Sequence, residues 1–505
     1  MPTLPKLNRE LFASGYSKPG SLSFFPTDRD LPEKVLQFGE GNFLRGFADW
    51  MINRLNAAGK FGGRVVVVQP IAQGLAEKLN SQDGLYTLLL RGMHNGSKVD
   101  QREIIDCISR ALNPYGQWEQ VLDVARSAEL RVIVSNTTEA GITYRAEDRP
   151  DDAPPASFPG KLTRLLFERY QSLGGESAPG LIILPCELIE RNGDALRTAV
   201  RQTSVNWSLP QGFLDWTARG NIFANTLVDR IVSGYPKDDA ATIAADLGYD
   251  DGLLVAGEPF HFWVIEAPEA CSKELPFDEV GLNVVFTDNM TPYRDRKVRI
   301  LNGAHTMTVP AAFLMGMNFV GEIMDDPMVR SFMIEGIAQE IIPTLDLPRP
   351  DLQSFAAAVV ERFGNPFVKH ALLSITLNSS SKFKSRIVPS IKRFAQANGT
   401  SPKRLAFSLA ALIAFYRGAG VDGASLRGRR GEEAYAIQDD AAALKLFATA
   451  WAELSDDIPA LVNHILSAAS IWGEDLSQLA DLSEKVTHSL QSILRDGARG
   501  AMQAL

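Results

Sequence analysis

Three polar side chains in one largely apolar segment could carry out chemistry on a carbonyl group. Lys297, Asn302 and His305 lie in KVRILNGAH, and at about 100° per residue all three can face one broad side of a helix. A lysine ammonium can protonate a ketone oxygen as hydride arrives at the carbon, and an asparagine amide can donate to the developing oxyanion. The histidine can orient a substrate hydroxyl. A snorkelling lysine, a capping asparagine and a core histidine would give the same pattern.

A glycine turn near the N-terminus could hold the pyrophosphate of a dinucleotide. It follows a short strand and precedes a helical pattern, which is where such phosphates bind. The candidate residues of this turn are Phe38, Gly39, Glu40, Gly41, Asn42 and Phe43. Leu44 replaces the third glycine of the G-x-G-x-x-G fingerprint, so a plain tight turn is the alternative.

Two further strand ends carry candidate cofactor ligands. Gln69 stands where a carboxylate commonly accepts from the adenosine ribose; it can bond a ribose but does not repel a 2′-phosphate. Gln69 therefore slightly favours NAD over NADP as the cofactor. The alternative is that Gln69 only ends the strand and faces solvent. Asn136, Thr137 and Thr138 follow another strand and suit a nicotinamide or sugar contact, or helix capping by the threonines.

The elements that must hold these residues alternate in the first half of the chain and become helical in the second. The strand patterns are residues 34–38, 64–68, 131–135 and 181–184. The helical patterns between them are residues 43–55, 117–126 and 161–173. This alternation predicts an α/β Rossmann-type N-terminal domain, residues 1–290, with a doubly wound parallel sheet.

The remaining residues, 291–505, are expected to form a mostly α-helical C-terminal domain. Its helical patterns are residues 354–363, 405–416, 441–454 and 458–469. Residues 148–159, rich in Pro and Asp, and the glycine-rich residues 418–431 are predicted to be loops.

Composition excludes several classes of protein. The chain has 505 residues and a net charge of −9, which argues against general electrostatic attachment to nucleic acid. Three scattered cysteines and six scattered histidines favour neither a disulfide framework nor a metal site. The longest apolar run is too short to span a bilayer, so we expect a cytoplasmic protein without membrane contact. The sequence does not fix the oligomeric state.

Several long motifs resemble the long-chain polyol dehydrogenases, the family that contains mannitol 2-dehydrogenase and the hexuronate reductases. The motifs are FGEGNFLRGFADW (38–50), QDGLYTLLLRG (82–92), SNTTEAGI (135–142), KLTRLLFERY (161–170), PCELIERNGDALR (185–197), TLVDRIVSGYP (226–236), KVRILNGAHT (297–306) and IQDDA (437–441). The resemblance covers nearly the whole chain. It implies a Rossmann domain and a helical domain with the site in the cleft between them.

The resemblance also implies an activity: an NAD-dependent, zinc-independent enzyme that interconverts D-altronate and D-tagaturonate, small hexonate and hexuronate substrates. In the family motif, the lysine matching Lys297 is the general acid and base, Asn302 matches an oxyanion residue, and His305 matches a residue that positions substrate. Asp229 resembles a residue lining the sugar site, although a structural pair with Arg230 is the alternative.

This sequence differs from the family motif at one position, so the identity of a second oxyanion donor stays open. Mannitol dehydrogenases have an asparagine directly after an acidic residue, whereas this chain has Leu188 after Glu187. Asn192 is a candidate replacement, or it only makes a turn with Gly193. Glu187 could itself face the site.

A uronate carboxylate needs a cation or several N–H donors when it is buried. Lys382 and Arg386, four residues apart, could share one helix face, and we expect one of them to bind the carboxylate. A solvated basic face is the alternative. Other functions that remain open are reduction of fructuronate, reduction of fructose as in mannitol 2-dehydrogenase, and a non-catalytic nucleotide-binding regulator.

Overall fold

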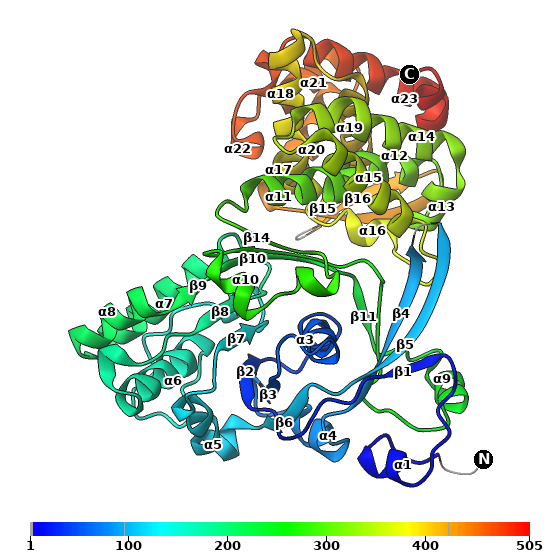
Figure 1. The fold of residues 1–505 in the computed structure, drawn as a ribbon. Helices are drawn as coiled ribbons and strands as arrows, with labels where there is room; N and C mark the ends of the chain where they lie inside the picture. Colours follow the sequence, from blue (N-terminus) through cyan, green and yellow to red (C-terminus); the bar gives the residue numbers. More distant parts are fainter. Residues whose placement is uncertain (1–3, 95, 423–424) are drawn as a thin grey trace. The chain divides into compact units, whose positions relative to one another are not determined.

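The computed structural model describes residues 4–94, 96–422 and 425–505. The chain divides into two compact units with different folds (Figure 1). Unit 1 comprises Met1–Gly92 and Ser97–Met290, and unit 2 comprises Met93–Gly96 and Thr291–Leu505.

Unit 1 is built on a six-stranded parallel sheet with the strand order β6-β3-β2-β7-β8-β9. Its strands are β2 (Glu33–Phe38), β3 (Arg64–Val68), β6 (Ile108–Leu112), β7 (Val132–Ser135), β8 (Ile182–Pro185) and β9 (Ile222–Phe223). Strand β2 lies between β3 and β7, so the strand order reverses beside it. The predicted Rossmann-type fold is confirmed, and ligands bind at such a reversal in sheets of this kind.

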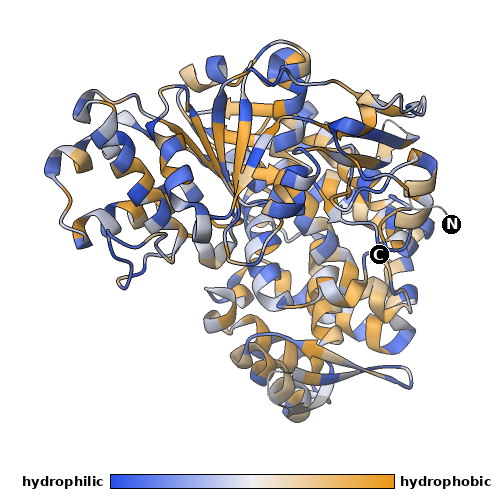
Figure 2. Ribbon diagram, turned by 90° about the horizontal axis from the view of Figure 1, so that it is seen from below, coloured by the Kyte–Doolittle hydropathy of each residue, from blue (hydrophilic) through white to orange (hydrophobic). Residues whose placement is uncertain are grey.

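Both faces of this sheet are buried because successive side chains of a strand point to opposite sides. Val35, Val65 and Val134 contribute to a core cluster shared with α3 (Ala48–Ala57), whereas Leu36 and Val66 contribute to the cluster on the other face. The strands of the sheet accordingly show mainly orange, hydrophobic residues in Figure 2. The helices of unit 1 are α1 (Arg9–Ala13), α2 (Asn42–Arg45), α3 (Ala48–Ala57), α4 (Ala76–Ser81), α5 (Pro114–Arg126), α6 (Phe158–Ser172), α7 (Asn192–Asn206), α8 (Gln211–Gly220), α9 (Ala240–Leu247) and α10 (Ala270–Glu274).

Unit 1 also contains two sheets that the sequence did not predict. A five-stranded sheet has the order β1-β5-β4-β12-β11, and a three-stranded sheet has the order β10-β13-β14. Their strands are β1 (Leu22–Phe24), β4 (Tyr86–His94), β5 (Ser97–Ile105), β10 (Asn225–Asp229), β11 (Val232–Gly234), β12 (Val255–Gly257), β13 (Phe262–Glu266) and β14 (Val284–Thr287). Leu88 pairs with Val255, so this sheet joins segments that lie far apart in the sequence.

Unit 2 is mostly helical, as predicted. Its helices are α11 (Thr291–Arg296), α12 (Gly303–Leu314), α13 (Val320–Asp325), α14 (Pro327–Gly336), α15 (Arg349–Phe363), α16 (Leu372–Ile375), α17 (Ser379–Arg386), α18 (Val388–Asn398), α19 (Lys403–Phe415), α20 (Ala441–Leu454), α21 (Ile458–Leu466), α22 (Ala469–Trp472) and α23 (Leu482–Gln503). Helix α19 is buried from Leu405 to Phe415 and packs against α12 and α23. No helix among the described residues has the length and apolar character needed to cross a bilayer.

The prediction that residues 418–431 form a loop is wrong for the part that the structure describes. Strands β15 (Gly418–Asp422), β16 (Ser425–Arg430) and β17 (Glu433–Gln438) form an antiparallel meander. Gly428 pairs with Tyr435, and a Cβ at Gly428 would lie 2.5 Å from the tyrosine ring. The glycine that suggested a loop is therefore needed because an aromatic ring lies across it.

Candidate active site

The glycine turn after β2 lies where the carboxyl ends of β2, β3 and β7 meet. The Gly39 nitrogen donates to the Val68 oxygen over 2.9 Å, and the Asn136 nitrogen donates to the Phe38 oxygen over 3.1 Å. Gly39 has a φ of +122°, and a Cβ there would lie 3.0 Å from the Asn136 oxygen. Glycine is therefore required both by the backbone conformation and by the closeness of the next loop. Leu44 closes the other side, 3.3 Å from the same Cβ position.

The helix after this turn is divided into two. Gly41 is the N-cap of the short helix α2. Phe47 has a non-helical backbone conformation and is the N-cap of α3, so it separates the two helices. The Phe43 ring stacks on the Phe47 ring with 5.0 Å between centroids, and the Asn42 side-chain oxygen accepts from Arg45 over 2.8 Å. Because the first N–H groups of a helix have no partner within it, this turn offers backbone donors of the kind that bind phosphates.

Gln69 lies buried at the end of β3 and bonds to its own loop. Its Nε2 group donates to the Ile71 and Ala72 carbonyl oxygens over 2.9 and 3.0 Å, and its Oε1 accepts from the Ala76 nitrogen over 3.2 Å. To contact a ribose, Gln69 would have to give up one of these bonds.

Glu40 is the acidic group in this region. It is 7% exposed, its Oε1 accepts from the Leu75 nitrogen over 3.4 Å, and its Oε2 has no partner among the described residues. Burial raises the pKa of this carboxyl above its usual value. A Cβ at Gly74 would lie 2.5 Å from the Glu40 Oε1 and 2.7 Å from the Gln69 Oε1, so Gly74 leaves room for both side chains.

A network of buried hydrogen bonds supports the glycine turn. The Gln37 Nε2 group donates to the Gly39 oxygen over 3.0 Å and to the Asp49 carboxylate over 3.2 Å. The Tyr86 hydroxyl donates to the Arg45 oxygen over 2.7 Å. Burial raises the pKa of Asp49 to about 7. These bonds fix the conformation of the glycine turn through side chains that do not face solvent.

The loop after β7 is held by a buried carboxylate. Glu187, directly after Cys186 at the end of β8, accepts from the Thr137 nitrogen over 2.9 Å and from the Ser135 hydroxyl over 3.1 Å. Burial raises the pKa of Glu187. Thr138 has a φ of +142° and a ψ of 167°, a conformation that is otherwise almost confined to glycine and costs about 1–3 kcal/mol. Such strain persists where the surroundings impose it, and the Glu187 bonds fix the residue directly before Thr138.

Asn192 and Asp229 are held by two other elements: Asn192 is the first residue of α7, and Asp229 is the last residue of β10. Asn192 is 1% exposed, and its Nδ2 group donates to the Pro185 and Thr226 carbonyl oxygens over 2.9 and 3.1 Å. An oxyanion contact from Asn192 would require these bonds to break. Asp229 is the buried last residue of β10, opposite Phe262.

In unit 2, the helix that carries Lys297 contains a π-helical turn that the sequence did not predict. This turn spans Lys297–Asn302 between α11 and α12. In a π-helix residue i+5 bonds to residue i, so Asn302 lies over Lys297 rather than on the flank of the helix. Lys297, Asn302 and His305 are all half-buried. The insertion therefore brings the amide nearer to the lysine than an uninterrupted α-helix would.

His305 is packed so that it stays neutral. Its ring stacks on Phe363 with 4.0 Å between centroids and meets the His370 ring edge-on at 5.4 Å. Burial, followed by the neighbouring His370 and Arg386, lowers the pKa of His305 to about 3. Its Nδ1 is buried without a partner among the described residues. The ring can therefore exchange a hydrogen bond with a substrate hydroxyl as a neutral imidazole.

Two cations lie beside His305 on α17, which packs against α12 and the π-helical turn. The Lys382 ammonium donates to the Ile375 oxygen over 2.9 Å, and Arg386 donates to the Thr306 hydroxyl over 3.3 Å. Within the described part of the chain, neither has a carboxylate within 4.0 Å. Burial lowers the pKa of both groups. Half-buried cations without an anionic partner form a site suited to a carboxylate.

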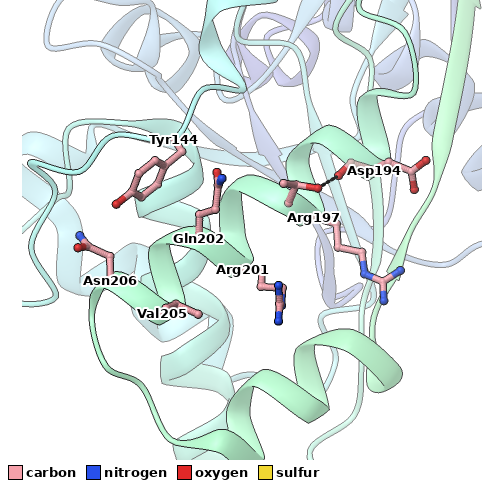
Figure 3. Close-up of a pocket in the computed structure, with 8 residues that line it drawn as sticks. Tyr144, Asp194, Arg197, Arg201, Gln202, Val205 and Asn206 are labelled. Atoms are coloured by element: carbon pink, nitrogen blue, oxygen red, sulfur yellow. Dashed lines mark hydrogen bonds between the residues drawn. The ribbon is translucent and has the colours of Figure 1, made fainter.

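Other places in the described chain are weaker candidates. No group of three or more potential metal ligands occurs among the described residues. A cavity of about 800 Å³ lies along α7 in unit 1, and Figure 3 shows Gln202 and Asn206 near Tyr144, with Arg197 further along the helix. It contains none of the residues that the sequence singled out.

These features define a class of protein: a two-unit dehydrogenase in which a Rossmann-type unit accompanies a helical unit bearing a lysine, an asparagine and a histidine on one helix. The model of the mannitol dehydrogenase Rossmann domain matches residues 33–279, and that of the mannitol dehydrogenase C-terminal domain matches residues 289–494. The chain belongs to the mannitol dehydrogenase family, which confirms the resemblance seen in the motifs.

Relatives with known names lie within the same family. An altronate oxidoreductase of Klebsiella pneumoniae (strain 342) is 47% identical over 478 residues, covering 94% of this chain and 97% of the relative. An altronate oxidoreductase of Escherichia coli O1:K1 / APEC is 46% identical over the same share of each chain.

Solved structures share the fold. A D-sorbitol dehydrogenase in substrate-free form matches with a TM-score of 0.82 and 21% identity, covering 98% of this chain and 100% of that chain. Pseudomonas fluorescens mannitol 2-dehydrogenase, in a ternary complex with NAD and D-mannitol, matches with a TM-score of 0.68 and 22% identity, covering 99% of each chain.

Proposed function

We propose that this protein is an NAD-dependent oxidoreductase that interconverts D-altronate and D-tagaturonate. The observation that carries the reaction is the 46–47% identity, over 94% of this chain, to relatives named altronate oxidoreductase. A sugar acid as substrate agrees with the two half-buried cations, Lys382 and Arg386, beside a neutral His305.

The residues of unit 1 fit a dinucleotide. The glycine turn supplies backbone donors for the pyrophosphate, with Asn136 and Thr137 from the adjacent loop nearby. The Oε2 atom of Glu40, buried and without a partner among the described residues, can accept from a ribose hydroxyl and would repel a 2′-phosphate. This supports NAD rather than NADP. When bound, NADH supplies the hydride for reduction of the ketone.

The residues of unit 2 transfer the proton and orient the substrate. The Lys297 ammonium gives its proton to the ketone oxygen during reduction, and the amine takes the proton back from the alcohol during oxidation. The Asn302 amide donates to the same oxygen as negative charge develops there, because it lies over Lys297 in the π-helical turn. His305, held neutral, orients a neighbouring hydroxyl.

Lys382 and Arg386 bind the carboxylate that distinguishes a uronate from a neutral ketose. Among the described residues, the Lys382 ammonium donates to the Ile375 oxygen and Arg386 donates to the Thr306 hydroxyl, both neutral acceptors. A substrate carboxylate would supply a negative charge in direct contact and could accept from both side chains. Asp229 lines the sugar site in this proposal, from the end of β10.

A substrate panel tests the proposal against its alternatives. We expect the protein to oxidise NADH with tagaturonate, with kcat/KM higher than with fructuronate or fructose, and higher with NADH than with NADPH. Turnover of fructuronate alone would assign the other uronate. Preference for fructose would assign the mannitol dehydrogenase reaction, and binding of NADH without turnover of any ketose would favour a nucleotide-binding regulator.

A further inference from the structure

A buried carboxylate in unit 2 ties the helix that carries Lys382 to the β-meander. Asp439, which directly follows β17 in the IQDDA motif, is 8% exposed. Its Oδ2 accepts from the Ser380 backbone nitrogen over 2.9 Å, and its Oδ1 accepts from the Ser380 hydroxyl over 2.9 Å. The Tyr416 hydroxyl also donates to this carboxylate. Burial and the Asp439 charge raise the pKa of Tyr416, so this donor keeps its proton.

These bonds cap the first turn of α17. The helix begins after Asn378, which has a φ of +54° and whose side chain makes no capping bond. The Asn378 nitrogen donates to the Gln438 oxygen over 3.0 Å, so the chain entering the helix is also fixed to the end of β17. Asp439 thus takes the role that an N-cap side chain usually has, although it lies 59 residues away from Ser380. On the same helix, Phe383 is fully buried with its ring edge-on to Trp472.

The orientation of the Lys382 and Arg386 side chains depends on these bonds between Asp439 and α17. Lys382 and Arg386 are i and i+4 on an eight-residue helix, so they point to the same side and move together with it. If the first turn of α17 shifted, both side chains would shift relative to His305 and Thr306.

We propose that Asp439 is a positioning residue for sugar-acid recognition: it anchors α17 so that Lys382 and Arg386 meet the substrate carboxylate together. The inference rests on the proposed function, because it presupposes that the two cations bind a carboxylate.

Asp439 also affects the charge of Lys382. Burial and the charge of Arg386 lower the pKa of Lys382, whereas Asp439 raises it. The other titratable neighbours are His305 and His370, whose pKa values the Lys382 charge lowers. Among these groups Asp439 is the one that carries negative charge, so it favours the ammonium form of Lys382.

The variant D439N removes the charge and keeps the size of the side chain. We expect KM for tagaturonate to rise about tenfold, the effect of weakening one charge-assisted contact, while kcat changes by less than about threefold. The matched control is D440N, because Asp440 is adjacent, is exposed, and caps α20 through the Ala442 nitrogen, a role that asparagine also fills. Equal KM values in D439N and D440N would overturn the proposal.

A second measurement does not depend on turnover. The rate of acetylation of Lys382, followed by peptide mass spectrometry across a pH series, reports the pKa of its amine, with the exposed Lys384 as internal reference. In D439N the Lys382 profile should shift to lower pH, whereas in D440N it should not. An unshifted profile would contradict the coupling. If the wild type reduced no uronate, the proposed function would fail, yet this profile would still test the Asp439 contact.

A third variant covers the case in which D439N does not fold. S380A keeps the carboxylate and the backbone bond but removes the hydroxyl donor. We expect KM for tagaturonate to rise about threefold with little change in kcat, since one neutral hydrogen bond is lost. An unchanged KM in S380A would then overturn the proposal.

Discussion

Replacement of Lys382 by methionine tests carboxylate recognition because it keeps an apolar stem and removes the ammonium. Lys382 is half-buried, and within the part of the chain that the structure describes its ammonium donates to the Ile375 carbonyl oxygen. A hydrogen bond to a charged group contributes about 1.5–3 kcal/mol, and each ~1.4 kcal/mol is a factor of ten. We therefore expect KM for tagaturonate to rise about 10- to 100-fold, while KM for fructose changes by less than about threefold.

Steady-state kinetics that follow NADH absorbance with both ketoses give these values directly. K384M is the matched control, because Lys384 lies on the same helix and is exposed. The pH dependence adds a second check. Because the pKa of Lys382 is lowered, the wild-type KM for tagaturonate should rise as alkaline pH removes its proton, and K382M should lack this rise. Equal effects of K382M on the two ketoses, or equal effects of K382M and K384M on tagaturonate, would refute the assignment.

Other residues give separate expectations. K297M should lower kcat about 10²- to 10⁴-fold with NADH binding retained, as measured by fluorescence titration; a kcat near that of the wild type would exclude Lys297 as the proton donor. G39A should weaken NADH binding about tenfold or more, because its Cβ would meet the Asn136 oxygen at a positive φ; an unchanged Kd would count against the glycine turn as the cofactor site. E40Q should raise the ratio of kcat/KM for NADPH to that for NADH about tenfold, since a negative charge near the ribose is lost; a constant ratio would contradict that position. The pKa of His305 falls from 6.5 to about 3 on folding, so only the unfolded chain takes up this proton between those values. The free energy of unfolding should thus decrease as pH falls below 6.5, by up to ~1.4 kcal/mol per unit, and H305N should lose this contribution in urea denaturation at pH 7 and pH 5.

The parallel sheet could be predicted because its strands carry their signal locally. Val65 to Val68 is an uninterrupted apolar, β-branched run, and the structure buries it on both faces. The sheets that pair β4 with β12 and β10 with β13 could not be predicted in the same way. Apolar runs such as Phe262 to Ile265 are present, but the pairing joins segments that meet only in the folded chain. For the meander, glycine suggested a loop, whereas the strand depends on Tyr435 lying over Gly428.

The sequence suggests candidate residues for the site but not how they are arranged. Lys297, Asn302 and His305 were identified from one segment, but ordinary helical periodicity does not contain the π-helical turn that brings the first two together. His370 and Phe363 were missed, since neither has a local motif and both matter only through their packing on His305.

Gln69 and Asn192 show a different limit of the sequence. Their residue types suit ligand contacts, and nothing in the sequence reveals that their amides bond to backbone carbonyl groups. The sequence raises the possibility that Glu187 faces the site, but it does not reveal the bonds of Glu187 to Thr137 and Ser135, which depend on the adjacency of β7 and β8.

Transfer of deuterium from NADH that carries two deuterium atoms on the reactive ring carbon tests the proposed reaction most directly. The wild-type protein is incubated with labelled NADH and tagaturonate, and the product is analysed by mass spectrometry against authentic altronate. We predict altronate that carries one deuterium on its new carbinol carbon, formed in step with the loss of NADH absorbance. Recovery of unchanged tagaturonate, with the label still on the nucleotide, would contradict the assignment.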